Sequence, residues 1–145
     1  MRILHVTAQR PDSTGSGVFL HETVMALREM GYEQAVVAGV GPKDASLFPD
    51  NVLFEPVRFE TVDLPFPVVG MSDVMPYRAT RYRDLTPEMV AQFKAAFNAA
   101  FDRVFAEFEP DVILCLSNTM RSTHIASLVM NHMPMKNSSL SMILL

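Results

Sequence analysis

Apolar runs alternate with polar, glycine-containing stretches along the first part of the chain, and this pattern predicts a strand, a helix and a second strand. Residues 2–7 and 33–40 are short apolar runs of the kind that parallel sheets bury. Between them, apolar positions fall at helical spacing from Leu20 onward, so we expect a helix that begins near Gly17 and stops at Gly31. This order is the opening unit of an α/β domain.

The middle of the chain is less regular. Residues 52–59 alternate weakly and predict a third strand, and Pro56 within it indicates an edge or a kinked position. Across residues 60–84, three prolines and a glycine predict a long loop without regular structure. Loops of this length are uncommon in compact domains and are often functional, so we consider this one a candidate binding loop.

A long helix is the clearest prediction of the second half. It begins at Thr86-Pro87, a hydroxyl cap followed by a proline at the first helical position, and ends before Pro110. Its apolar positions recur at spacings of three and four and are expected to be core: Phe93, Phe97, Phe101, Val104 and Phe108. Residues 111–115 then predict another buried strand.

The composition changes after Cys115. Residues 116–145 contain no Asp or Glu, and their apolar positions show no clear period. We therefore expect an α/β domain over residues 1–115, with a parallel sheet flanked by helices, and an atypical tail over 116–145. A helix over 123–133 is the one element that this tail suggests, and its apolar stripe is poor.

Composition and charge narrow the function. The 145 residues fit one domain, and their net charge of −4 favours neither nucleic acid nor an anionic membrane as a partner. No segment reaches the roughly 18 uninterrupted apolar residues of a membrane span. The single cysteine, Cys115, forms no internal disulfide, and we expect a reducing, cytoplasmic location.

The turn before the first helix is the candidate anion site. Gly15, Ser16 and Gly17 lie where the first helical amides would face a phosphate, and Arg10 could add a positive charge. The two glycines would allow close backbone approach and positive φ angles. An equally weighted alternative is structural: Ser16 only caps the helix, and the glycines only form the turn.

Two phosphate-binding motifs are excluded by spacing. A dinucleotide-binding fingerprint requires a third small residue where Leu20 stands and an acidic residue at the end of the second strand, which here ends Ala38-Gly39-Val40. A P-loop requires a lysine directly after its second glycine, and the first lysine is Lys43. Neither nicotinamide-cofactor binding nor nucleotide hydrolysis by a P-loop is expected.

Several stretches resemble a known family. RILHVTAQRP at 2–11, TGSGV at 14–18 and GYEQAVVA at 31–38 resemble the N-terminal half of family 4 glycosyltransferases, and PDVI at 110–113 resembles a later strand of that family. The resemblance covers residues 1–115. It implies the acceptor-side half of a GT-B architecture, in which two Rossmann-like domains face each other across a cleft and the nucleotide-sugar donor lies mainly on the second domain.

The resemblance also implies a mechanism and partners. Such enzymes generally retain anomeric configuration without a metal, so we expect no metal and no cofactor, and Gly15, Ser16 and Gly17 would lie near the donor phosphates, with Arg10 a weaker addition. The acceptor would be a sugar or another small molecule. Where the family commonly has a histidine-containing segment, this chain has Leu116-Ser117-Asn118. We therefore expect that the family's sequence is lost after about residue 115, by truncation or a shifted reading frame. We assign no catalytic residue and expect no catalysis by this chain alone. The alternative function is a non-catalytic α/β fragment or binding module with a weak phosphate or sugar site.

Other reactive side chains are given structural roles. Residues 77–83 bring together three arginines and two tyrosines, which suits a phosphorylated or sugar acceptor, although a solvated loop is the more common outcome of such a charge run. His5 is expected to be a buried, hydrogen-bonded neutral imidazole, and Cys115 a packed thiol. His124 and His132 have no supporting acid or thiol, so no metal site is predicted.

Overall fold

The computed structural model describes residues 1–70, 75–116 and 141–145. The helix expected over 123–133 lies outside these residues, as do His124 and His132. The described elements are, in order, β1 Arg2–Thr7, α1 Gly15–Glu29, β2 Glu33–Val40, β3 Val52–Arg58, β4 Val69–Gly70, β5 Thr80–Arg81, the 3-10 helix η1 Tyr82–Asp84, α2 Pro87–Glu107, β6 Val112–Cys115 and β7 Ser141–Leu144.

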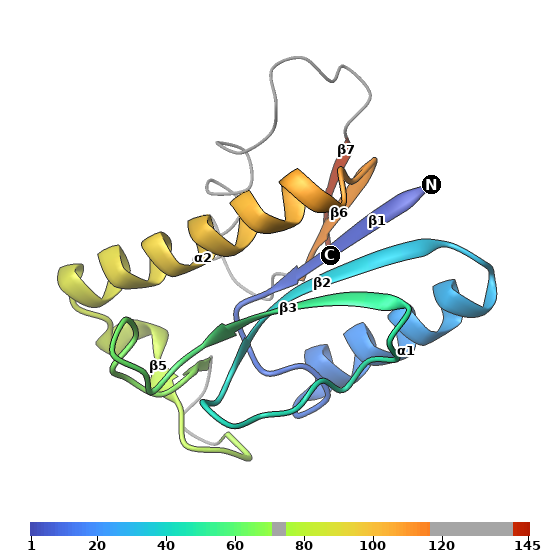
Figure 1. The fold of residues 1–145 in the computed structure, drawn as a ribbon. Coiled ribbons are helices and arrows are strands. Elements are labelled where there is room, and N and C mark those ends of the chain that lie inside the picture. Colours follow the sequence, from blue (N-terminus) through green and yellow to red (C-terminus); the bar gives the residue numbers. More distant parts are fainter. Residues whose placement is uncertain (71–74, 117–140) are drawn as a thin grey trace.

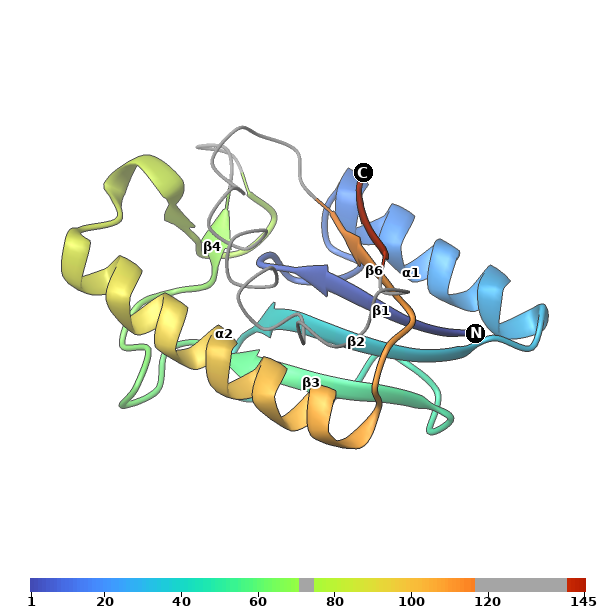
Figure 2. The same cartoon turned by 90° about the horizontal axis from the view of Figure 1, so that it is seen from above.

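The chain is α/β, as predicted, with a five-stranded sheet in the order β3-β2-β1-β6-β7. All four strand pairs are parallel. The two helices lie on opposite faces, α1 below and α2 above the sheet in Figure 1, and the view from above in Figure 2 shows α2 running across β2 and β3. This is a Rossmann-like arrangement, in which the loops at the carboxyl ends of the strands meet at one edge.

Each face of the sheet has its own hydrophobic cluster. On the α2 face, alternate residues of the strands pack with the phenylalanines of α2, and Phe97 and Phe101 are fully buried. On the α1 face, Leu20 and Val24 of the helix pack on Val36 and Ala38 in a smaller cluster. The phenylalanine stripe is therefore core, as its spacing predicted, except that Phe108 at the helix end is only partly buried.

Both helices have the ends that the sequence suggests, with one change. The Thr86 side chain caps α2 by accepting from the Met89 amide at 3.2 Å. Gly31, with φ of 83°, ends α1, and its amide donates to the Arg28 carbonyl at 2.9 Å. The start of α1 differs, because the helix begins at Gly15 and not near Gly17.

The region over 60–84 is more regular than predicted. β4 and β5 form a two-stranded parallel sheet, and η1 follows directly, beyond the carboxyl ends of the main strands. The prolines exclude long strands but not strands of two residues. This is why the prediction of a loop without regular structure was wrong. The edge position expected for Pro56 is confirmed, because β3 ends the order of the sheet.

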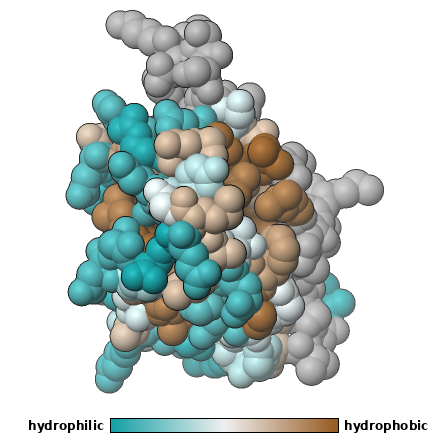
Figure 3. Space-filling view, turned by 90° about the vertical axis from the view of Figure 1, so that its right-hand side faces the viewer, coloured by the Kyte–Doolittle hydropathy of each residue, from teal (hydrophilic) through white to brown (hydrophobic). Residues whose placement is uncertain are grey.

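β7 was not predicted. Ser141–Leu144 lies beside β6 in parallel, with Ile113 opposite Met142. On the side drawn in Figure 3, hydrophilic residues gather on the left, and hydrophobic residues extend from the centre to the right. None of the described helices has the length and apolar character needed to cross a membrane.

Candidate functional site

The turn between β1 and α1 is held by the hydroxyl of Thr14. Thr14 has an extended backbone, with φ of −140°, and its Oγ1 accepts from the Gly17 amide at 3.3 Å. Ser16 lies inside the first turn, and its hydroxyl is 3.2 Å from that of Thr14. The interpretation of Ser16 as the cap is therefore wrong: three hydroxyl residues compete for that role, and Thr14 has the required extended conformation.

Gly17 is required by packing. A Cβ at this position would lie 2.8 Å from both the Arg10 carbonyl oxygen and the Asp12 amide nitrogen, which are backbone atoms that cannot rotate away. A Cβ at Gly15 would meet no atom within 4 Å. Neither glycine has the positive φ that we expected; in this turn that conformation belongs to Asp12, with φ of 70°.

We expect Gly17→Ala to lower the free energy of unfolding by about 1–3 kcal/mol, the usual cost of overpacking against a fixed backbone. Gly15→Ala is the matched control, since the added methyl enters open space and alanine favours a helix. Urea titration of both variants measures the difference. Equal stability of the two variants would contradict the close approach at Gly17.

Arg10 is bound within the chain. Its Nη2 lies 2.9 Å from Asp44 Oδ2, and its guanidinium carbon lies 5.1 Å from the centroid of the Tyr77 ring. The same Asp44 oxygen accepts from the Gly41 amide at 2.7 Å. An incoming phosphate would therefore compete with Asp44 for this charge.

Asp44 and Tyr77 are thus part of the site, and sequence reasoning did not pair them with Arg10. Asp44 follows β2 after Gly41, Pro42 and Lys43, and Arg10 follows β1. Because carboxyl ends of neighbouring parallel strands share one edge, this proximity could have been predicted. The position of Tyr77 could not, because it depends on the fold of a long connection.

The Tyr77–Arg83 segment packs on the domain more closely than a solvated loop would. Tyr77 and Tyr82 are partly buried against the α2-side cluster. Burial raises the pKa of Tyr77, and it raises the pKa of Tyr82 to about 12. The packing of these two rings against the core anchors the segment.

Two of the arginines in this segment have acidic partners. Arg78 Nη1 lies 3.4 Å from Glu60 Oε1, and Arg81 is hydrogen-bonded to Asp84. Both pairs are exposed, so each contributes little to stability, about 0–1 kcal/mol. Separating either pair would therefore cost little free energy.

His5 and Cys115 are structural, as expected. His5 Nε2 lies 2.9 Å from Gln34 Oε1, and burial lowers the pKa of His5 to about 4. The Gln34 amide nitrogen donates to the Val24 carbonyl at 2.8 Å, so its oxygen must accept and His5 Nε2 carries the proton. Burial raises the pKa of the Cys115 thiol to about 12, which leaves it a poor nucleophile.

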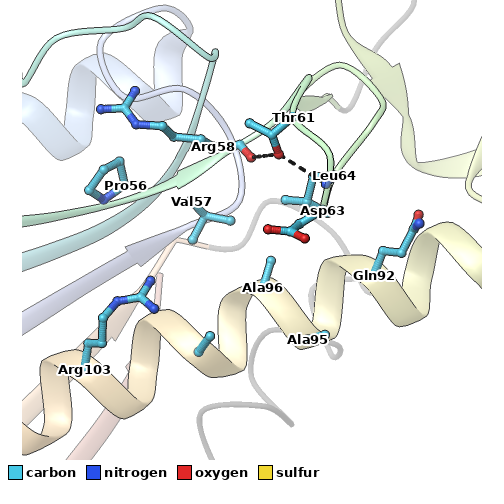
Figure 4. A pocket seen from close by; sticks show the side chains of 11 residues that line it. Pro56, Val57, Arg58, Thr61, Asp63, Leu64, Gln92, Ala95, Ala96 and Arg103 are labelled. Carbon is cyan, nitrogen blue, oxygen red and sulfur yellow. Dashed lines mark hydrogen bonds between the residues drawn. The ribbon is translucent and has the colours of Figure 1, made fainter.

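A separate pocket of about 550 Å³ lies between β3 and α2 (Figure 4). Val57 and Leu64 face alanines of α2 across it, and polar residues form its rim. None of the residues of the predicted anion site lines it. No sequence pattern pointed to this pocket, because its residues come from two regions, 56–64 and 92–103, that are distant along the chain.

Comparison with known proteins adds no identification. No model of a known protein family matches the chain, and no curated protein matches its sequence. A functional interpretation therefore has to start from the sequence resemblance and from the geometry of the sheet edge.

Proposed function

We propose that this chain is the acceptor-side domain of a retaining, metal-independent glycosyltransferase that uses a nucleotide-sugar donor. The proposal rests on the resemblance of residues 1–115 to family 4 enzymes. One structural observation supports it: Arg10 lies over Tyr77 and pairs with Asp44, so three loops meet at the carboxyl edge of a parallel sheet, beside the first turn of α1.

The first turn of α1 would bind the donor phosphates. Thr14 occupies the Gly17 amide, whereas helix geometry gives the amides of Gly15 and Ser16 no acceptor within the helix. These amides and the positive end of the helix dipole suit a phosphate oxygen. The acceptor would lie toward the Tyr77–Arg83 segment, whose arginines suit a sugar or phosphate group. The free, buried thiol fits the cytoplasmic location that we propose.

Gly15→Pro tests the amide directly. Proline is favoured at the first helical position and lacks the amide hydrogen, and the extended Thr14 before it is compatible with proline. We expect Gly15→Pro to fold normally and to bind UDP-glucose or GDP-mannose about tenfold more weakly, because one hydrogen bond to a charged group is lost. Affinity is measured from amide chemical shifts during titration.

Gly15→Ala is the control, because it keeps the amide and adds a methyl in open space. Equal affinities of the proline and alanine variants would show that this amide holds no phosphate. If titration of the unmodified chain with nucleotide sugar did not change the amide chemical shifts of this turn, the proposed donor site would be overturned.

A non-catalytic binding module is the second candidate, and the turn itself favours it. Backbone packing accounts for Gly17, and the ion pair with Asp44 accounts for Arg10, without any ligand. Incubation of the chain with labelled nucleotide sugar tests the non-catalytic candidate. Family enzymes hold the donor mainly on the facing domain, so we expect neither transfer nor donor hydrolysis by these 145 residues alone; turnover would exclude the non-catalytic module.

A further inference from the structure

The pocket between β3 and α2 exists because α2 presents small side chains opposite the edge of the sheet. Ala95, Ala96 and Ala99 form the helix side, and Pro56 and Val57 form the strand side. Pockets of several hundred Å³ with apolar walls and a few polar groups are typical of small-molecule sites. The pocket lies apart from the proposed donor site, so its ligand is a different question.

A hydrogen-bonded turn closes one end of the pocket and positions Asp63. The Thr61 hydroxyl donates to the Arg58 carbonyl at 3.2 Å and accepts from the Leu64 amide at 3.2 Å (Figure 4). The Thr61 amide in turn donates to the Leu64 carbonyl at 3.1 Å. These bonds fix the backbone on both sides of Asp63, whose side chain is drawn between the turn and α2.

The charged side chains around the pocket differ in whether they have hydrogen-bond or ion-pair partners within the chain. Arg103 is paired with Glu55, at 2.6 Å between Nη2 and Oε1. Arg58 Nη1 donates to the carbonyls of Gly41 and Asp44, at 3.3 and 3.0 Å. Among the parts of the chain that the structure describes, no hydrogen bond or ion pair involves the carboxylate of Asp63. The pocket therefore has an apolar surface and one carboxylate, that of Asp63, that is available to a ligand.

We propose that this pocket binds a small ligand with an apolar body and a single cationic group, such as an aromatic or aliphatic amine. The body lies on the alanines of α2 and against Val57 and Leu64, and the cation lies at Asp63. Neither arginine favours an anionic ligand here, because Glu55 balances the charge of Arg103 and the guanidinium of Arg58 is directed away from Asp63 toward the carbonyls of Gly41 and Asp44 (Figure 4).

Titration with 2-phenylethylamine, followed by amide chemical shifts, tests the proposal. We expect shifts centred on the Thr61–Leu64 turn and the α2 residues of the pocket. The neutral isostere 2-phenylethanol should bind less tightly, and 3-phenylpropanoate should bind least. Asp63→Asn should weaken amine binding about threefold to fivefold, the value of an exposed ion pair, and leave the binding of the alcohol unchanged.

A second pair of variants tests the apolar part. Ala99→Leu keeps a strong helix former and fills the pocket, so it should abolish binding of both the amine and the alcohol. Ala106→Leu, at an exposed position of the same helix that does not line the pocket, is the matched control. Equal binding of amine, alcohol and acid would overturn the role of Asp63, and amine binding unaffected by Ala99→Leu would overturn the site.

Discussion

Replacing Phe97 by alanine should lower the free energy of unfolding by about 3–5 kcal/mol, the range found for buried aromatic residues. Phe97 is fully buried, and its ring centroid lies 4.5 Å from that of Phe93 and 6.1 Å from that of Phe101. Its removal would leave a cavity in the centre of the α2-side cluster. Since domains are stable by only about 5–15 kcal/mol, this one change would remove a large part of the free energy of unfolding. Urea unfolding followed by circular dichroism measures the loss.

Phe19→Ala is the matched control. Phe19 lies on α1 and is 52% exposed, so its removal opens no comparable cavity, and we expect a change within about 0.5 kcal/mol. A loss at Phe97 no larger than the loss at Phe19 would show that α2 does not pack on the sheet as described.

The stability of the protein should fall by about 3 kcal/mol between pH 7 and pH 4 on account of His5 alone. Burial lowers the pKa of this imidazole from 6.5 to about 4, so the folded state holds it neutral while the unfolded state is protonated. The unfolded chain therefore binds more protons in this window. The contribution is fully present above the unfolded pKa and is lost as the pH falls through the folded value.

His5→Gln removes the titration and keeps a donor toward Gln34. The variant should therefore not lose the stability that His5 costs the unmodified chain as the pH falls. Relative to the unmodified chain, its free energy of unfolding should rise by about 3 kcal/mol between pH 7 and pH 4. Parallel pH profiles of the His5 variant and the unmodified chain would contradict a buried neutral histidine.

The elements with a clear period were predictable from sequence. β1 and β2 have the expected bounds, and α2 follows its phenylalanine spacing from Pro87 to Glu107. In these segments local preference and burial agree, because one face of each helix and the length of each strand are apolar. β3 likewise has the edge position that Pro56 indicated.

The elements without a period could not be predicted. β4 and β5 have two residues each and exist through their pairing with each other, and β7 depends on pairing with β6. For β7 a signal was present, the apolar run Met142-Ile143-Leu144, but an apolar run of this length does not distinguish a strand from other structures.

The candidate site divides in the same way. Sequence reasoning found the turn at Gly15, Ser16 and Gly17, because glycines and hydroxyls before a helix are a local signal. It did not find the partners of Arg10, which depend on how three loops meet. The pocket beside Asp63 depends on a helix and a strand edge that pack side by side, and its alanines are ordinary helix residues until the fold is known.

The two faces of the sheet differ in how much buried apolar surface packs against each helix. The α1-side cluster is the smaller one, and the proposed phosphate-binding turn belongs to the helix that it retains. Regions with fewer buried apolar contacts open locally at a lower free energy than the whole domain, so amide hydrogens of α1 would exchange with solvent before those of α2. An anion bound at the first turn would then slow hydrogen exchange in α1 selectively, because it binds only where α1 is formed. The affinity for the anion and the exchange rate of α1 would therefore both report the opening of this layer.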